Sequence, residues 1–312
     1  MVRIDIPKMK PTNADLHQVF IPIFTFWKFS GLPSFKLKKN VAGESVTFVN
    51  TKSGNFYLAL VGLTLLFGLA LWNIMSTNSD SAIIDDAMNT TELTMFFLLN
   101  VTIVILSNKK RQEISRVIDA LKYSEWLIVT LKRQNVSYTN SVKKGVLKLA
   151  TVKYGVIIIL CIVDCVNIPE DRVDLITYYF SWSFHFLFEL VIFAYFLILR
   201  SQYDELNDFL LRQNFEITDH RTIQNLIGAY SLLRKISKLV KSISEVFILV
   251  KAIADTIVTS VAVFYSLRMY SVLPDNLLLS TTSNILYYAL TAISNFTLAY
   301  VFHDLLEKVI QI

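Results

Sequence analysis

The 312-residue sequence has few charged residues, few glycines and only two cysteines. Charged residues make up 18% of the chain, against about 25% in ordinary soluble domains. Two cysteines cannot build a disulfide framework, and the eight glycines include no phosphate-binding loop or dinucleotide fingerprint. Because serine-elbow and His-Glu-x-x-His motifs are also missing, the sequence predicts neither an enzyme nor a bound cofactor. No histidines cluster near Cys161 and Cys165 in the sequence. We therefore interpret these cysteines as packing residues rather than metal ligands.

Hydrophobic residues, in contrast, make up 54% of the chain and gather in long runs. Residues 56–75 carry no charge over 20 positions, which at 1.5 Å per residue matches a hydrocarbon core of about 30 Å. Two other runs are similarly long, and three more contain one to three charged residues each. We therefore predict an all-α, polytopic membrane helix bundle with about six transmembrane helices. The predicted spans are 56–75, 87–106, 146–168, 175–199, 246–267 and 276–302.

The positions of lysine and arginine give the orientation of these spans. Of the 30 Lys and Arg residues, 25 lie in the N-terminal segment and in the segments that alternate with it, two lie in the intervening loops and three lie within spans. Lys and Arg accumulate on the cytoplasmic side of membranes, so residues 1–55 are predicted to be a cytoplasmic segment and 56–312 a single transmembrane domain. Proximity to the membrane also explains the pI near 9.0 without nucleic-acid binding.

Two of the cytoplasmic loops have the apolar pattern of a helix. Apolar residues recur at spacings near 3.6 along 111–134 and along 223–241, and the second stretch runs into span five. Spans three and five are therefore expected to extend well into the cytoplasm. The two apolar stripes either pack together as an intracellular layer or lie on the membrane surface.

Ionisable residues within the spans are candidates for function, because a charge in lipid costs at least about 2.5 kcal/mol and must face protein or water. His185 and Glu189 are four residues apart in span four, so they are predicted to meet as a proton relay, as a ligand contact or as a structural hydrogen bond. Lys251 and Asp255 have the same spacing in span five and predict a structural ion pair. Asp164, near the outer end of span three, is expected to be solvated or paired.

Aromatic residues collect in the outer halves of spans four, five and six. They either line a pocket for a small organic ligand or mark the membrane interface, where Trp and Tyr gather in any membrane protein. Asn89 begins a glycosylation sequon in the first outside loop. The candidate ligand-binding residues are Tyr178, Tyr179, Trp182, His185, Phe186, Tyr265, Tyr287 and Tyr288.

Four stretches, taken in their order along the chain, resemble the insect gustatory receptors, of the superfamily that also contains the insect odorant receptors. The first, FIPIFTFWKFSGLPSFKL, precedes span one, and the second, ISRVIDALKYSEWL, lies in the cytoplasmic helix. The third is Asp204–Asn207 after span four, and the fourth is SEVFILVKAIADTIVTSVAVFYSLRMY in span five.

The resemblance implies a ligand-gated, non-selective cation channel in the plasma membrane of sensory neurons. It implies a homo- or hetero-tetramer that is embedded in lipid and opened by small-molecule tastants, with a ligand pocket among the outer halves of spans two to six. The odorant-receptor branch and, from another class, a secondary transporter with ion-coupling charges remain alternatives.

The sequence departs from the family at its C-terminal end. Relatives carry a seventh span with a Thr-Tyr and Gln-Phe motif that lines the pore, whereas this sequence reaches Ile312 just after span six. No pore residue is carried over, and we expect a product truncated before the pore helix that conducts no ligand-evoked current by itself.

Overall fold

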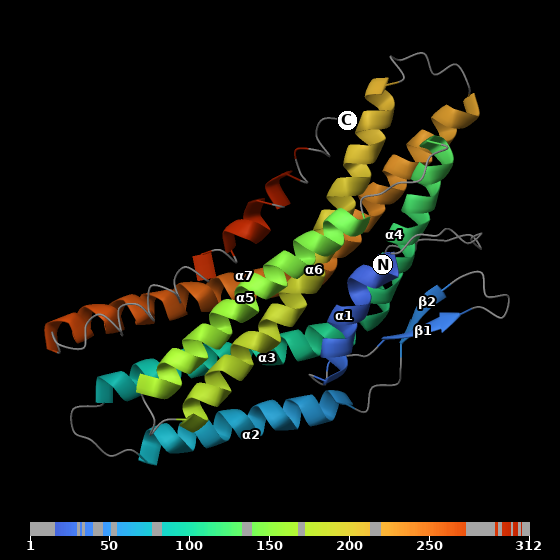
Figure 1. Ribbon diagram of the computed structural model, residues 1–312. Coiled ribbons are helices and arrows are strands. Elements are labelled where there is room, and N and C mark those ends of the chain that lie inside the picture. Colours follow the sequence, from blue (N-terminus) through green and yellow to red (C-terminus); the bar gives the residue numbers. More distant parts are fainter. Residues whose placement is uncertain are drawn as a thin grey trace.

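A computed structural model gives the fold of the chain (Figure 1). Its helices are α1 (Leu16–Phe29), α2 (Asn55–Ser76), α3 (Ile83–Lys109), α4 (Arg111–Lys132), α5 (Thr139–Asn167), α6 (Arg172–Arg212) and α7 (His220–Val272). Two strands, β1 (Phe35–Lys39) and β2 (Val46–Asn50), form an antiparallel hairpin in which Leu37 lies opposite Phe48. The structure describes residues 16–29, 32, 35–39, 46–50, 55–76, 83–132, 139–167, 172–212, 220–272, 291–292, 295–300, 302–304 and 307.

The predicted polytopic helix bundle is confirmed. Within the described residues, four segments are long and apolar enough to cross a membrane, and each overlaps one of the first four predicted spans. The fifth predicted span forms part of α7, and most of 276–302 lies outside the described residues. The four segments are Tyr57–Ser76, Ala87–Lys109, Thr139–Val163 and Tyr179–Arg212.

The spans differ in how far they are enclosed by protein. In α2 only 17% of the most apolar 18-residue stretch is buried inside the protein. Leu58, Leu65 and Trp72 are exposed along this helix. In α6 the corresponding fraction is 89%. Exposed apolar side chains on a hydrophobic span fit a lipid environment, so α2 lies at the periphery and α6 at the centre of the bundle.

Helices α6 and α7 continue beyond their predicted spans into the segment that was assigned to the cytoplasm. The expected extension of span five is confirmed, because α7 begins at His220. Span three also extends, by about two turns, because α5 begins at Thr139, seven residues before the predicted start at Val146. Helix α6 extends as well, which was not expected, and runs on to Arg212 with Leu206 and Phe209 buried.

The amphipathic helix at 111–132 is joined to span two rather than to span three. Only Lys110 separates α3 from α4, and backbone hydrogen bonds continue across it, from Lys110 N to Leu106 O (2.7 Å) and from Ile114 N to Lys110 O (2.9 Å). The apolar stripe of α4 is buried, including Ile114, Val117 and Leu121. Of the two arrangements left open by the sequence, the structure has the packed layer.

Polar contacts fix the register of α4 along α6. The Tyr195 hydroxyl donates to Ile114 O (3.2 Å), and Gln202 Nε2 donates to Leu121 O (2.9 Å). Both contacts join residues 81 positions apart, so the two helices run in parallel. Figure 1 shows α4, the C-terminal part of α6 and the N-terminal part of α7 side by side.

The N-terminal helix α1 belongs to the same core as the spans. The Trp27 indole donates a hydrogen bond to Leu187 O (3.3 Å), and its ring stacks on Phe188. Phe20, two turns earlier, packs on Tyr195. Because α1 follows α6 from Tyr195 back to Leu187, it is antiparallel to α6 and reaches the middle of the fourth span.

Candidate functional site

A buried ion pair joins two spans in the middle of the bundle. Lys153 of α5 pairs with Glu189 of α6, and their side chains are 3% and 1% exposed. The Lys153 ammonium also lies 4.4 Å from the centroid of the Phe186 ring, where the ring face attracts a cation. Lys153 is one of the charged residues of predicted span three, and the structure makes it part of a polar core.

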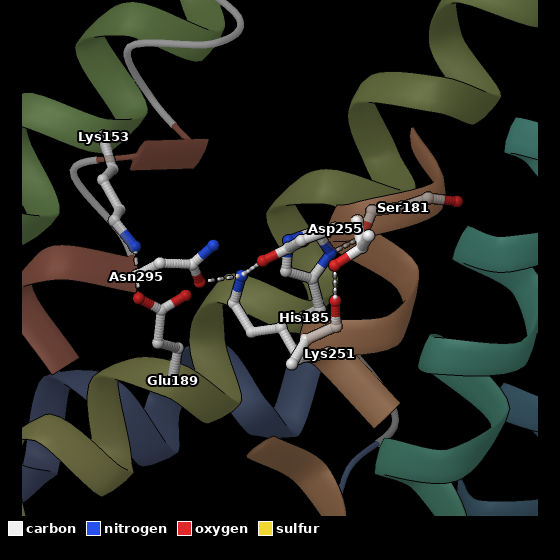
Figure 2. Close-up of polar contacts among 9 residues, drawn as sticks. Lys153, Ser181, His185, Glu189, Lys251, Asp255 and Asn295 are labelled. Atoms are coloured by element: carbon white, nitrogen blue, oxygen red, sulfur yellow. Dashed lines mark hydrogen bonds and ion pairs between the residues drawn. The ribbon is translucent and has the colours of Figure 1, made fainter. Parts of the chain in front are cut away.

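A second ion pair lies on α7. Lys251 Nζ is 2.5 Å from Asp255 Oδ2, so the ion pair predicted in span five is confirmed. The same ammonium lies 3.4 Å from Asn295 Oδ1 in the C-terminal helical residues. Figure 2 shows Lys251 between Asp255 and Asn295, with the Lys153–Glu189 pair nearby. Two cations and two anions from three helices therefore neutralise one another inside the bundle.

His185 has a different partner from the one expected. Its Nδ1 lies 3.1 Å from Ser181 O, and its ring stacks on Phe96 of α3 with centroids 5.9 Å apart. Glu189, which the spacing placed beside His185, pairs with Lys153. The i,i+4 spacing brings two side chains to one face of a helix, but the neighbouring helix supplied the stronger partner for the carboxylate.

The charged residues surround a small cavity of about 30 Å³. That volume holds one or two water molecules, and the surrounding groups offer several hydrogen-bonding atoms. It is too small for an organic ligand, since ligand pockets measure about 300–1,000 Å³. The lining residues are Lys153, Ile157, Trp182, His185, Phe186, Glu189, Lys251, Asp255 and Thr291.

A larger cavity of about 690 Å³ lies next to the small one and shares Lys251 and Asp255 with it. Its wall is mostly apolar, with hydroxyl groups from Thr256, Thr259 and Ser260. This volume and this mixture of apolar surface with a few polar groups are typical of small-molecule sites. The remaining lining residues are Phe196, Ile248, Ala252, Asn295, Leu298, Ala299 and Phe302.

Two contacts hold the C-terminal helical residues against α6 beside the larger cavity. Arg200 Nε lies 2.5 Å from Asp304 Oδ2, and the rings of Phe196 and Phe302 are 5.7 Å apart. Phe196 and Arg200 belong to the half of α6 that the charge pattern assigns to the cytoplasmic side. The larger cavity therefore lies nearer that predicted side than the aromatic residues that the sequence analysis selected.

Four of the eight candidate ligand-binding residues are described, and they are buried together. Tyr179 packs edge-on to Trp182, which in turn packs edge-on to Phe96. Trp182, His185 and Phe186 line the small cavity. Their assignment to a ligand stays a prediction. The side chains of Tyr178, Tyr265 and Asp164, and the whole of Tyr287 and Tyr288, lie outside the described residues.

Sequence reasoning missed the larger cavity, although one signal for it was present. Thr256, Thr259 and Ser260 follow Asp255 at helical spacing in an otherwise apolar span, which places hydroxyls on one side of α7. Asn295 carried no such signal, because its relevance depends on packing between segments 44 residues apart. Asn89 is exposed near the start of α3, and its glycosylation stays a prediction.

Comparison with known proteins identifies the architecture. No protein-family model matches the sequence, and no curated protein matches it. The chain is similar to the solved structure of the insect olfactory receptor OR5 from Machilis hrabei, with a TM-score of 0.67 and 11% sequence identity over 94% of this chain and 81% of that one. The chain therefore has the fold of an insect olfactory receptor.

Proposed function

We propose that the chain is a chemosensory receptor subunit, specifically a gustatory one, in which a small organic molecule bound between the spans controls a cation-conducting assembly. The observation that carries this proposal is the fold, shared over 94% of the chain with an insect olfactory receptor. The sequence resemblance to gustatory receptors along the chain supports the taste branch. A tetramer in the plasma membrane of sensory neurons would follow from the same family pattern.

The larger cavity supports a ligand of mixed polarity. Its volume of about 690 Å³ suits a small organic molecule. The apolar wall would bind hydrocarbon or ring surface, while Lys251, Asn295 and the three hydroxyls of α7 would hydrogen-bond a polar group of the ligand. The charged core beside the cavity would then respond to ligand binding, since Lys251 and Asp255 contact both spaces.

A binding screen tests the proposed function. Purified chain in detergent would be heated with a panel of sugars, bitter alkaloids, volatile esters and amino acids, and its unfolding temperature measured for each. A ligand at 100 times its Kd stabilises the folded state by about 2.7 kcal/mol, which is readily measured. Stabilisation by sugars or alkaloids supports a gustatory receptor, whereas the absence of stabilisation by any compound contradicts the proposal.

An odorant receptor is the second candidate function, and the solved structure that the chain resembles is itself an olfactory receptor. Selective stabilisation by volatile esters in the same screen would favour it. Selective stabilisation by amino acids would favour the secondary transporter. The observation that motivated a transporter has weakened, because Glu189 pairs with Lys153 rather than with His185.

A further inference from the structure

The exposed face of α7 changes character where the helix leaves the predicted membrane. Between residues 231 and 246 the exposed side chains are those of Ser231, Arg234, Lys235, Lys238, Lys241, Glu245 and Val246. Four of these seven are cationic and one is anionic. We call Arg234, Lys235, Lys238 and Lys241 the basic stripe.

The level of the membrane surface beside this stripe is fixed by a contact between helices. Lys110 Nζ lies 3.1 Å from Ser242 Oγ, so the end of α3 and residue 242 of α7 are at one height. On the membrane side of that height, the exposed side chains of α3 and of α7 from Val246 onward are mostly apolar, with Ile248 and Leu249 exposed on α7. Lys241 and Lys238 are therefore in the first two turns of α7 outside the hydrocarbon.

The rest of the protein leaves the basic stripe unoccupied. The opposite face of α7 packs on α3 and α4 through buried residues such as Leu233, Ile236 and Val240. Among the described residues, no ion pair includes a member of the stripe. A juxtamembrane row of lysine and arginine attracts anionic lipid headgroups, in addition to helping to orient the protein.

The height of the stripe distinguishes between headgroups. Arg234 to Lys241 extends about 10 Å along the helix axis at 1.5 Å per residue, which is more than the single phosphate layer of a simple phospholipid. A phosphorylated inositol headgroup carries its additional phosphates farther from the hydrocarbon, at the height of Arg234 and Lys235. We propose that the basic stripe of α7 binds the headgroup of a polyphosphoinositide in the cytoplasmic leaflet.

The test measures lipid binding by the full chain purified in detergent. Dioctanoyl phosphatidylinositol 4,5-bisphosphate is titrated against the wild-type chain and a K238Q/K241Q variant. The control variant R116Q/R212Q removes the same charge from two exposed arginines outside the stripe, on α4 and α6. We expect K238Q/K241Q to bind about 30-fold more weakly and the control variant to bind like the wild type.

Three further arms make the result decisive. Phosphatidylserine and phosphatidylcholine of the same chain length should bind more weakly than the bisphosphate lipid, and soluble inositol 1,4,5-trisphosphate should bind more weakly than the lipid. Equal loss in both variants, equal binding of phosphatidylserine, or full binding by the soluble headgroup would overturn the proposal. Unfolding temperatures of the variants, expected to equal that of the wild type, separate lost binding from lost structure. The chemosensory ligand screen is unaffected by either outcome.

Discussion

At the scale of single residues, the polar core is distinguished by how completely it is enclosed. Lys153 and Glu189 are almost fully buried in a bundle whose surroundings are apolar. A buried pair of opposite charges is close to neutral in its net contribution, but an unpaired buried charge costs several kcal/mol. Each charge of the pair therefore depends on the other.

Removal of one charge should be much more damaging than removal of both. We expect Glu189→Gln to destabilise the folded chain by about 3–5 kcal/mol, because Lys153 would remain buried without its counter-ion. The double variant K153M/E189L should recover most of that loss. Thermal unfolding in detergent measures both effects.

A lysine one and a half turns away provides the matched control for this prediction. Lys148 also lies on α5 but is exposed, so Lys148→Met should change stability by less than about 0.5 kcal/mol. If Glu189→Gln proved as mild as Lys148→Met, the buried pair would not have the role assigned to it here.

The pKa of Asp119 predicts a pH-dependent stability. Burial raises the pKa of this carboxyl on α4 from 3.8 to about 6, although nearby Lys122 acts in the opposite direction. The folded state then binds the proton more tightly than the unfolded state, so ionisation of Asp119 destabilises the fold. This cost is fully present above pH 6, decreases as the pH falls through 6 and is absent below 3.8.

Asp119→Asn should therefore raise the unfolding temperature at pH 7.5. Each 1 kcal/mol of this cost corresponds to about 2–4 °C in a chain of about 150–250 residues, and the difference from the wild type should decrease as the pH falls through 6 and be absent below pH 3.8. Asp208→Asn, at an exposed carboxylate of α6, serves as the control. It should leave the unfolding temperature unchanged at both high and low pH. A pH-independent difference for Asp119→Asn would contradict this explanation.

At the scale of elements, the packing of α4 on α6 depends on buried side-chain contacts with the backbone of α4. Gln202 is fully buried, donates to Leu121 O and accepts a hydrogen bond from Ser124 Oγ at 2.5 Å. Lys132 and Glu205 form an ion pair near the end of α4. These contacts hold α4 parallel to α6.

Gln202→Leu should loosen α4 without unfolding the spans. A buried polar group that loses its partner costs about 1–3 kcal/mol, and the cost would fall on the α4–α6 contact. Limited trypsin digestion should cleave within α4 faster in this variant than in the wild type. Gln224→Leu, at an exposed position of α7, should leave the cleavage rate unchanged. If Gln202→Leu were cleaved within α4 no faster than the wild type, Gln202 would not hold α4 against α6.

The pattern of apolar residues predicted the helices better than it predicted their connections. The stripe along 111–134 is local information, and α4 formed at 111–132. The extension of α6 to Arg212 was missed, because Asp204, Glu205 and Asp208 interrupt the hydropathy of that stretch, while burial of Leu206 and Phe209 against other helices holds it. Tertiary contacts decided where each long helix ends.

At the scale of the whole molecule, charge alternation and hydrophobic run length were sufficient to predict a multi-span bundle. The same patterns could not predict which side chains meet in the candidate site. The i,i+4 spacing predicted the ion pair of Lys251 with Asp255 within one helix. The partner of Glu189, in contrast, is Lys153 on another helix, 36 residues earlier in the chain. The larger cavity depends on packing of α6, α7 and residues 295–302, which no local pattern encodes.

The central claim is that the larger cavity binds a small organic ligand, and a cavity-filling variant tests it most directly. Ala252 lines the cavity, so Ala252→Phe should occupy the space, whereas Ala87→Phe places the same ring at an exposed position near the start of α3. Ligand-induced shifts in unfolding temperature would be measured for both variants with each stabilising compound from the screen. We predict that the shift survives in Ala87→Phe and is lost in Ala252→Phe; an undiminished shift in Ala252→Phe would contradict the claim.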